Sequence, residues 1–294
     1  MAALLSCSSL RVDDQGAPAV DGLTFATTGE RVLVLGAASV LFEAAAGLRP
    51  AVRGEIRVEG SVPVDAVRRR VAAGAPLDPR MPAKWTPRQY VTWSARLAGH
   101  AGAQAGELAE EALARTRVDS VGSTRLGSAG LTARRATVLA AALATGATTL
   151  ILEDPLAGLP SESVPAFARV VARACADRRV AVFAARLPLE SPLALEADEA
   201  LVVAGSVVAA QGAPGEIAAA SRSFWVRVMG DVDAFARAVE ERGARVSPAS
   251  GLEPARVGHL SVDLGPLGAA DLVRIASDVR ATVLELRPIS AAFA

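Results

Sequence analysis

Lysine is almost absent from the sequence, which contains only Lys84 among 294 residues. This lysine lies in the run Ala-Lys-Trp-Thr-Pro, which looks nothing like a glycine-rich loop. A loop that holds nucleotide phosphates follows the pattern G-x-x-x-x-G-K-S/T, because its glycines expose backbone N–H groups and its lysine reaches the outer phosphates. The sequence therefore contains no standard phosphate loop.

The sequence also has no net charge, and it contains only two cysteines and two histidines. The 31 basic residues balance 31 acidic residues and do not cluster, so no nucleic-acid partner is expected. Cys7 and Cys175 lie far apart without the spacing of metal ligands, which favours buried or idle free thiols over a disulfide. His100 and His259 have no ligating residues near them in sequence, so no metal site is expected.

Two apolar segments are too short to predict a membrane-spanning helix or a leader. Residues 136–152 are apolar but include four threonines and one glycine, and 17 residues is the lower limit for a span. This run predicts a helix followed by a strand. The N-terminal MAALLSC lacks basic residues and is too short for a signal peptide. We therefore expect a soluble cytoplasmic fold.

Strand-like apolar runs alternate with helical patterns through the first two thirds of the chain, which predicts an α/β fold around a mostly parallel sheet. The run at 31–35 ends at Gly36, as a buried parallel strand ends at a turn. The other predicted strands are 55–58, 149–152, 180–183 and a hairpin of 200–203 with 206–209, and the predicted helices are 89–97, 107–115, 134–143 and 165–175.

The composition changes after Ser221, where a second domain is predicted. Asp231 is placed to cap a helix that stops at Gly243. The predicted order is βαββαβ, a split ferredoxin-like arrangement. Its elements are a strand at 224–229, the capped helix, strands at 244–247 and 259–264, a helix at 269–277 and a strand at 282–287. The boundary is therefore predicted near residue 220, between domains 1–220 and 222–294.

A pair of acids follows one predicted strand. The run Leu-Ile-Leu-Glu-Asp-Pro at 150–155 places Glu153 and Asp154 at the end of a buried strand. Nucleoside triphosphatases hold Mg²⁺ and polarise the attacking water at such a position, and a phosphate loop normally completes the site. Here one half of that arrangement is present and the other half is missing.

Read together, these runs resemble the nucleotide-binding subunit of ABC transporters, especially of the ABC-2 exporter type. Ala-Gly-Leu-Arg-Pro at 46–50 with Gly-Glu-Ile at 54–56 resembles the stretch after the family's phosphate loop. Trp-Thr-Pro at 85–87 resembles the start of its helical subdomain, and 206–212 its closing hairpin. The resemblance implies an ABC-type P-loop NTPase-like domain with a helical subdomain at about 84–135, followed by the subfamily's C-terminal extension.

The positions that carry the chemistry in this family depart from its pattern. Counting from Gly36, the second loop glycine falls on Leu41, the lysine on Phe42 and the hydroxyl on Glu43. The span from Gly36 to Gly47 is also about four residues shorter than the family pattern, which predicts a truncated loop. A carboxylate such as Glu43 would repel a triphosphate. We expect a plain strand–turn–helix here.

The remaining family positions are altered too. The adenine-stacking aromatic falls near Asp14, the Q-loop glutamine near Pro76, and the switch histidine on Arg186, expected to be a solvated surface arginine. The LSGGQ signature aligns with Ala-Gly-Leu-Thr-Ala at 129–133, where leucine replaces a glycine.

The order of Glu153 and Asp154 reverses the family's order of magnesium ligand and catalytic base. Exchanging the two changes the reach of each side chain by one methylene, and reaction geometry tolerates little error. Both acids are therefore expected to be vestigial. We expect no catalytic residue in this chain, and no bound nucleotide, other cofactor or metal.

The resemblance and its departures predict a bacterial pseudo-ATPase, a non-catalytic subunit that plays a structural or regulatory part in an ABC transporter complex. The implied partners are an intact ABC ATPase subunit and an integral membrane permease, at the inner face of the cell membrane. Two alternatives remain open. One is an active but atypical ATPase subunit of a heterodimeric exporter, and the other is a free cytoplasmic scaffold protein.

Overall fold

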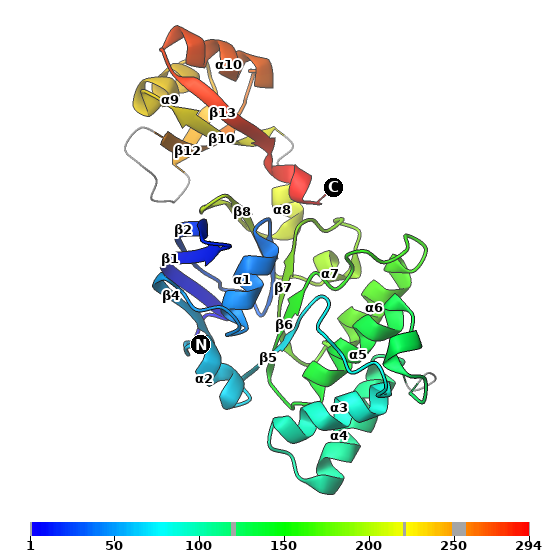
Figure 1. Cartoon of the computed structure of the whole chain (residues 1–294). Helices are drawn as coiled ribbons and strands as arrows, with labels where there is room; N and C mark the ends of the chain where they lie inside the picture. The colour runs from blue at the N-terminus through cyan, green and yellow to red at the C-terminus, as the bar shows by residue number, and fades with distance from the viewer. Residues whose placement is uncertain (1, 119–121, 220–221, 249–256, 294) are drawn as a thin grey trace.

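The computed structural model describes residues 2–118, 122–219, 222–248 and 257–293. In Figure 1 a larger unit contains the chain up to α8, and a smaller unit built from β10 to β13 stands at one end of it. The domain boundary predicted near residue 220 falls on residues 220–221, which lie outside the described residues.

The larger unit is built around a six-stranded sheet with the order β5-β6-β7-β3-β8-β9. Every neighbouring pair is parallel except the β8–β9 hairpin. The predicted alternation of strands and helices around a mostly parallel sheet is therefore confirmed. The strands are β3 (Arg31–Leu35), β5 (Ala72–Ala75), β6 (Thr149–Glu153), β7 (Arg179–Ala184), β8 (Glu199–Ala204) and β9 (Val207–Gly212).

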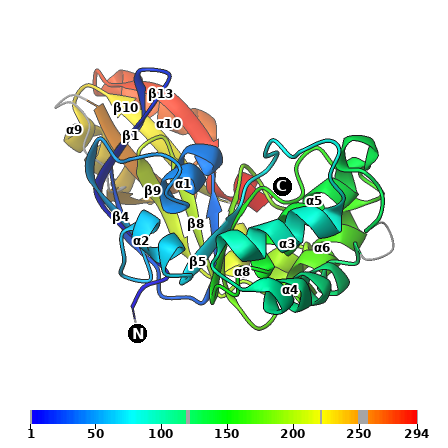
Figure 2. The same ribbon diagram turned by 60° about the horizontal axis from the view of Figure 1, so that its bottom comes forward.

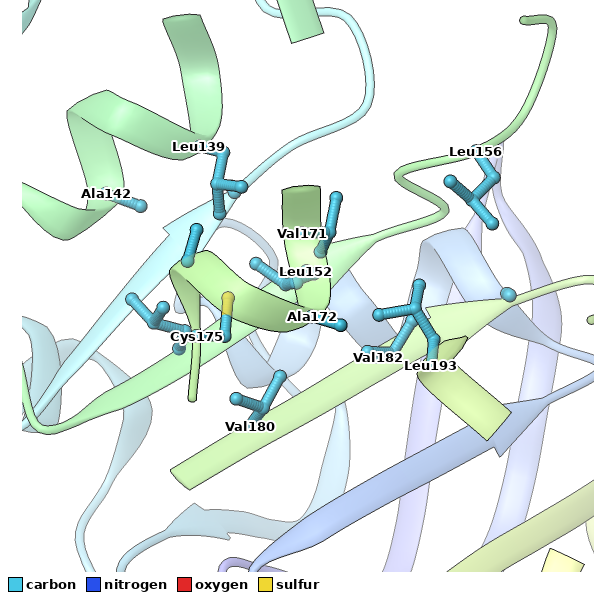
Figure 3. Close-up of a cluster of buried hydrophobic side chains, with 14 of the residues drawn as sticks. Leu139, Ala142, Leu152, Leu156, Val171, Ala172, Cys175, Val180, Val182 and Leu193 are labelled. Carbon is cyan, nitrogen blue, oxygen red and sulfur yellow. The ribbon is translucent and has the colours of Figure 1, made fainter. Parts of the chain in front are cut away.

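Both faces of this sheet are buried, which explains why its strands read as continuous apolar runs. In β3, Val32 and Val34 belong to one hydrophobic core and Leu33 and Leu35 to the core on the opposite face. Figure 3 shows part of the second core, where Leu152 and Val182 of the sheet meet side chains from neighbouring helices, including Cys175.

A three-stranded antiparallel sheet with the order β2-β1-β4 covers the first core. The N-terminal apolar residues that could mimic a signal peptide lie here, with Leu4 and Leu5 fully buried and Cys7 almost so. Burial raises the pKa of both thiols, to about 12 for Cys175, and neither cysteine forms a disulfide. The strands are β1 (Leu5–Asp14), β2 (Ala17–Ala26) and β4 (Arg53–Val58).

Helices cover the other face of the parallel sheet, where α3 to α6 gather on one side of the larger unit (Figure 2). Thr86 and Gln89 form a capping box that begins α3 at Pro87, two residues before the predicted start. The helices are α1 (Ala38–Ala45), α2 (Pro63–Arg68), α3 (Pro87–Leu97), α4 (Gly102–Arg115), the 3₁₀ turn η2 (Leu126–Ser128), α5 (Leu131–Leu143), α6 (Val164–Ala174), α7 (Pro192–Leu195) and α8 (Pro214–Ala219).

The apolar run at 136–152 divides as predicted, into the end of α5 and the strand β6. Among the described residues, no helix has both the length and the apolar character needed to cross a membrane. The predicted helix at 107–115 begins five residues earlier, at Gly102. The first turn was not predicted because it contains Gly102 and Gly106, and glycine disfavours a helix interior.

The smaller unit has the predicted βαββαβ order and an antiparallel sheet with strand order β11-β12-β10-β13, as in a ferredoxin-like fold. Asp231 caps α9 by accepting a hydrogen bond from the backbone N–H of Ala234 at 2.9 Å. Its elements are β10 (Ser223–Met229), α9 (Val232–Glu240), β11 (Arg245–Pro248), β12 (Val257–Asp263), α10 (Ala269–Asp278), β13 (Thr282–Pro288) and the 3₁₀ turn η3 (Ile289–Phe293).

Residues of the smaller unit are buried in the core of the larger one. Trp225, Ile289 and Phe293 belong to the same hydrophobic core as the helix-covered face of the parallel sheet. The backbone N–H of Leu187, just after β7, donates a hydrogen bond to the carbonyl of Ala292 at 3.0 Å. The turn η3 therefore attaches the end of the chain to the segment that follows β7, near α8 (Figure 1).

Candidate functional site

The carboxyl ends of the parallel strands form the edge where α/β folds bind ligands. The connection from β3 to α1 at this edge contains only Gly36 and Ala37. The N–H of Gly36 donates to the carbonyl of Ala184 at 3.0 Å, and the N–H of Ala38 donates to the carbonyl of Gly36 at 2.8 Å. These two backbone donors are therefore bonded within the protein and do not face a ligand.

Gly36 lies against the end of the neighbouring strand β8. Its φ of +115° is a conformation that residues with a side chain rarely adopt. A Cβ atom at this position would lie 1.9 Å from the carbonyl oxygen of Val203. The glycine is therefore needed for close packing of the turn on β8, apart from any ligand.

The start of α1 bears on the predicted phosphate-loop positions. In a phosphate loop the lysine and hydroxyl residues lead into the helix, and here that helix begins at Ala38. Its first two residues are Ala38 and Ser39, whereas Phe42 and Glu43, the predicted lysine and hydroxyl positions, lie within α1. None of these four residues carries a positive charge.

Phe42 lies one turn further along α1, is fully buried and packs edge-on against Phe183, with ring centroids 6.3 Å apart. Glu43 pairs with Arg49, with Oε2 and Nε 2.5 Å apart. The same guanidinium lies 3.2 Å from Oδ1 of Asp14. The hydrogen bond with Glu43 is the main cause of a raised pKa of Arg49. Asp14 and Glu43, the predicted adenine-stacking and hydroxyl positions, are thus both paired with Arg49.

The two acids at the end of β6 accept hydrogen bonds from the adjoining loops. Oε2 of Glu153 accepts from the backbone N–H of Leu77, next to Pro76, at 2.8 Å. Oδ2 of Asp154 accepts from the backbone N–H of Ala185, next to Arg186, at 3.3 Å. Burial raises the pKa of the Asp154 carboxyl above its ordinary value.

Arg135 on α5 lies close to these acids and was not singled out from the sequence. Its Nη2 donates to the carbonyl of Ala157 at 3.3 Å. The Nε and Nη1 atoms are buried and have no hydrogen-bond partner among the described residues. Burial lowers the pKa of this guanidinium, and the charges of Asp78, Asp154 and Glu153 oppose that shift. Its only signal in the sequence is its position on a helix that follows the 129–133 segment.

The segment 129–133 leads into α5, with Gly130 at the N-cap and Leu131 as the first helical residue. No atom of another segment lies within 4 Å of a Cβ built at Gly130, so this end of the helix is open. Arg186 is exposed.

The two histidines each contact another part of the chain. Nε2 of His100 lies 2.8 Å from the carbonyl oxygen of Thr145, and buried His259 packs against Trp225. Within the described ranges, no group of three or more His, Cys, Asp or Glu side chains could hold a metal ion.

No protein-family profile matches this sequence, and no curated protein matches it. Solved structures do match. CbiO1 from Clostridium perfringens, part of the ABC transporter complex cbiONQ, has a TM-score of 0.62 at 18% identity, covering 74% of this chain and 92% of its own. MJ1267, an ATP-binding cassette of an ABC transporter, has a TM-score of 0.63 at 14% identity, covering 74% of this chain and 94% of its own.

A third match, an ATP-binding subunit of an ABC transporter, has a TM-score of 0.59 at 17% identity and covers 73% of this chain and 91% of its own. At these identities the likeness establishes the fold. The chain has the P-loop NTPase-type fold of ABC ATP-binding cassettes, as its sequence predicted.

Proposed function

We propose that this protein is a non-catalytic, ABC-ATPase-like subunit that plays a structural or regulatory part in a membrane ABC transporter complex, of the ABC-2 exporter type. The observation that carries the proposal is the two-residue turn between β3 and α1. A phosphate loop surrounds the phosphates with successive backbone N–H groups and adds a lysine. Two residues followed by Ala38 supply neither the ring of donors nor the charge.

The bonding of the acids supports the same proposal. Glu153 and Asp154 each accept a hydrogen bond from a backbone N–H of an adjoining loop, which gives both carboxylates a structural part. We propose that neither acid holds a metal or activates water here.

The proposed partners are an intact ABC ATPase subunit and an integral membrane permease, with this subunit peripheral to the inner face of the membrane. The fold supports this assignment, since CbiO1 is itself part of a transporter complex. A groove offers a surface for the permease. It has a volume of about 400 Å³ and lies between β5 and the helices α2, α3 and α5, with Leu97 at its rim 66% exposed.

A nucleotide titration tests the catalytic part of the proposal. The purified chain is expected to show no saturable Mg-ATP binding in the micromolar range by calorimetry. The Ala38→Lys variant is expected to behave in the same way, because a lysine alone does not rebuild the loop. An intact ABC cassette titrated in the same buffer is the positive control. A saturable micromolar site in the unaltered chain would contradict the proposal.

Co-purification from native membranes tests the partners. The tagged chain is expected to recover an intact ABC ATPase and a permease. The Leu97→Asp variant should recover at least about ten-fold less permease, because a charge in an apolar contact is strongly unfavourable. The Leu195→Asp variant is the matched control, since Leu195 is 70% exposed on α7 and lies outside the groove. Recovery of no membrane protein would favour the free scaffold.

Asp154→Asn in the purified complex separates the proposal from an active but atypical ATPase. We expect ATP turnover by the complex to be unchanged, because the intact partner performs the hydrolysis. Loss of turnover with normal assembly would assign catalysis to this chain.

A further inference from the structure

A cavity of about 400 Å³ lies between the larger unit and the C-terminal sheet. Ligand pockets of small molecules fall in this range of volume and combine an apolar lining with a few polar groups. The cavity reaches the carboxyl ends of β3, β7 and β8 on one side and the end of β13 with η3 on the other. Its lining includes Gly36, Arg186, Val203, Trp225, Arg287 and Ala292.

The sheet of the smaller unit has an open face, meaning the face that its own helices do not cover, and this face lies toward the cavity. Its helices α9 and α10 pack on the opposite face, where Val226 and Val228 are buried. Residues that alternate with those valines project to the open face. Trp225 of β10 lies opposite Arg287 of β13 in the strand register. An aromatic and a cationic residue are thus side by side at the cavity.

Positive charge at the cavity comes from both units. Arg186, from the segment after β7, is exposed and makes no hydrogen bond or ion pair with any described residue. Arg287, from β13, forms an ion pair with Glu285, which also lies 4.0 Å from Arg227. One carboxylate therefore faces two arginines of the smaller unit, and the charge of Arg186 is left without a counterion in the described structure.

Trp225 adds a buried donor without a partner. Its side chain is 2% exposed, yet its indole Nε1 has no hydrogen-bond partner among the described residues. A buried donor that lacks a partner destabilises a fold. Trp225 lines the cavity, so its fluorescence can report on a ligand that binds there.

We propose that the cavity binds a small organic anion carrying carboxylate or phosphate groups. The oxygens of the anion face Arg186 of the larger unit and Arg287 of the smaller unit, beside the ring of Trp225. Because it contacts both units, the bound anion favours their docked arrangement, which the Leu187–Ala292 hydrogen bond also holds. The proposal adds a regulatory ligand to the proposed function and does not depend on whether the protein binds ATP.

Tryptophan fluorescence of the full-length chain tests this site. Replacing Trp85 and Trp93 by phenylalanine leaves Trp225 as the reporter, because the chain has three tryptophans. Pyrophosphate and citrate are titrated separately at constant ionic strength, up to about 10 mM, to cover weak ligands. We expect a saturable change in Trp225 fluorescence with at least one of them. A response to pyrophosphate alone assigns a phosphate ligand, and a response to citrate alone assigns a carboxylate ligand.

Charge variants show whether the response arises in the cavity. Arg186→Ala and Arg287→Ala should each weaken binding by about ten- to a hundred-fold, the range for one hydrogen bond to a charged group. Arg274→Ala is the matched control, since Arg274 is exposed on α10 and does not line the cavity. Absence of a saturable change with both probes would overturn the proposal. An equal response in all three variants would also overturn it, and circular dichroism confirms that each variant is folded.

Discussion

The ends of β3 and β6 lie at the same edge of one sheet, but they differ in the side chains that they carry. At the end of β3, two residues lead directly into α1, and the first of them packs against the carbonyl of Val203. At the end of β6, Glu153 and Asp154 are present, and each accepts a hydrogen bond from an adjoining backbone N–H. The end of β3 is held by backbone contacts, and the end of β6 carries two charged side chains that bind backbone N–H groups.

The difference between the two strand ends follows from how their polar groups are hydrogen-bonded when no ligand is present. The N–H groups of a phosphate loop point at an anion, so without a ligand they depend on water, and a short turn avoids them altogether. A carboxylate at a strand end has a second use, because it can accept from loops even when no metal is bound. The acids at the end of β6 therefore have a structural use that does not depend on a phosphate loop.

The largest expected effect comes from changing the β3 end, with Gly36→Ala. The added Cβ would lie 1.9 Å from a backbone carbonyl at a φ of +115°, so β3 and β8 must separate. We expect a loss of unfolding free energy of about 3 kcal/mol or more. Urea denaturation measures it. Gly102→Ala is the control, because no atom lies near its Cβ position, and it should change stability by less than about 1 kcal/mol.

At the β6 end, Glu153→Ala should have a moderate effect. It leaves the half-buried N–H of Leu77 without an acceptor, which should lower the free energy of unfolding by about 1–3 kcal/mol. Glu153→Gln retains an acceptor oxygen and should lose less than about 1 kcal/mol. Equal stability of the two variants would mean that the Leu77 contact does not matter. Urea denaturation at neutral pH compares them.

The smallest expected effect concerns the charge of Asp154. Burial raises its pKa in the folded state, so ionised Asp154 destabilises the fold above that pKa, and the penalty disappears as the pH falls below the unfolded value. Asp154→Asn should therefore be slightly more stable than the parent at neutral pH, by under about 1 kcal/mol because the group is partly exposed. At about pH 3, below the unfolded pKa of aspartate, the difference should vanish, as chemical denaturation at both pH values would show.

Asp177→Asn provides a control of opposite sign. The hydrogen bond from Arg115 lowers the pKa of Asp177, so its charge stabilises the fold above the unfolded pKa and this contribution is lost as the pH falls. The variant should be less stable than the parent at neutral pH. If both asparagine variants moved in the same direction, the assigned cause of the Asp154 shift would be wrong.

Regular periodicity made much of the fold predictable. The βαββαβ order of the smaller unit followed from clear alternation and from the Asp231 cap, and β3, β6, β7 and the β8–β9 hairpin followed from apolar runs. The strand β5 did not, because its sequence Ala-Ala-Gly-Ala has no β-branched or aromatic residue. It is a strand because it pairs with β6 in the buried sheet.

Local sequence could not place the parts of the candidate site. Counting forward from Gly36 placed the lysine position on Phe42, but the count could not show that α1 begins four residues earlier, at Ala38. Arg135 gave no signal by itself, since its relation to Asp154 and Glu153 depends on the packing of α5 against the β6 end. The cavity at Trp225 also requires two segments that lie far apart in the chain.

The sequence alone determined the α/β class, the ferredoxin-like C-terminal order and the single lysine, Lys84, outside any glycine-rich loop, because each depends on local periodicity or on the residues present. Tertiary structure alone decided that Arg49 pairs with Asp14, that the β6 acids bond to adjoining loops, and that Arg186 and Arg287 share one cavity. These relations join residues distant in the chain, and only the burial of apolar surface between packed elements brings such residues together.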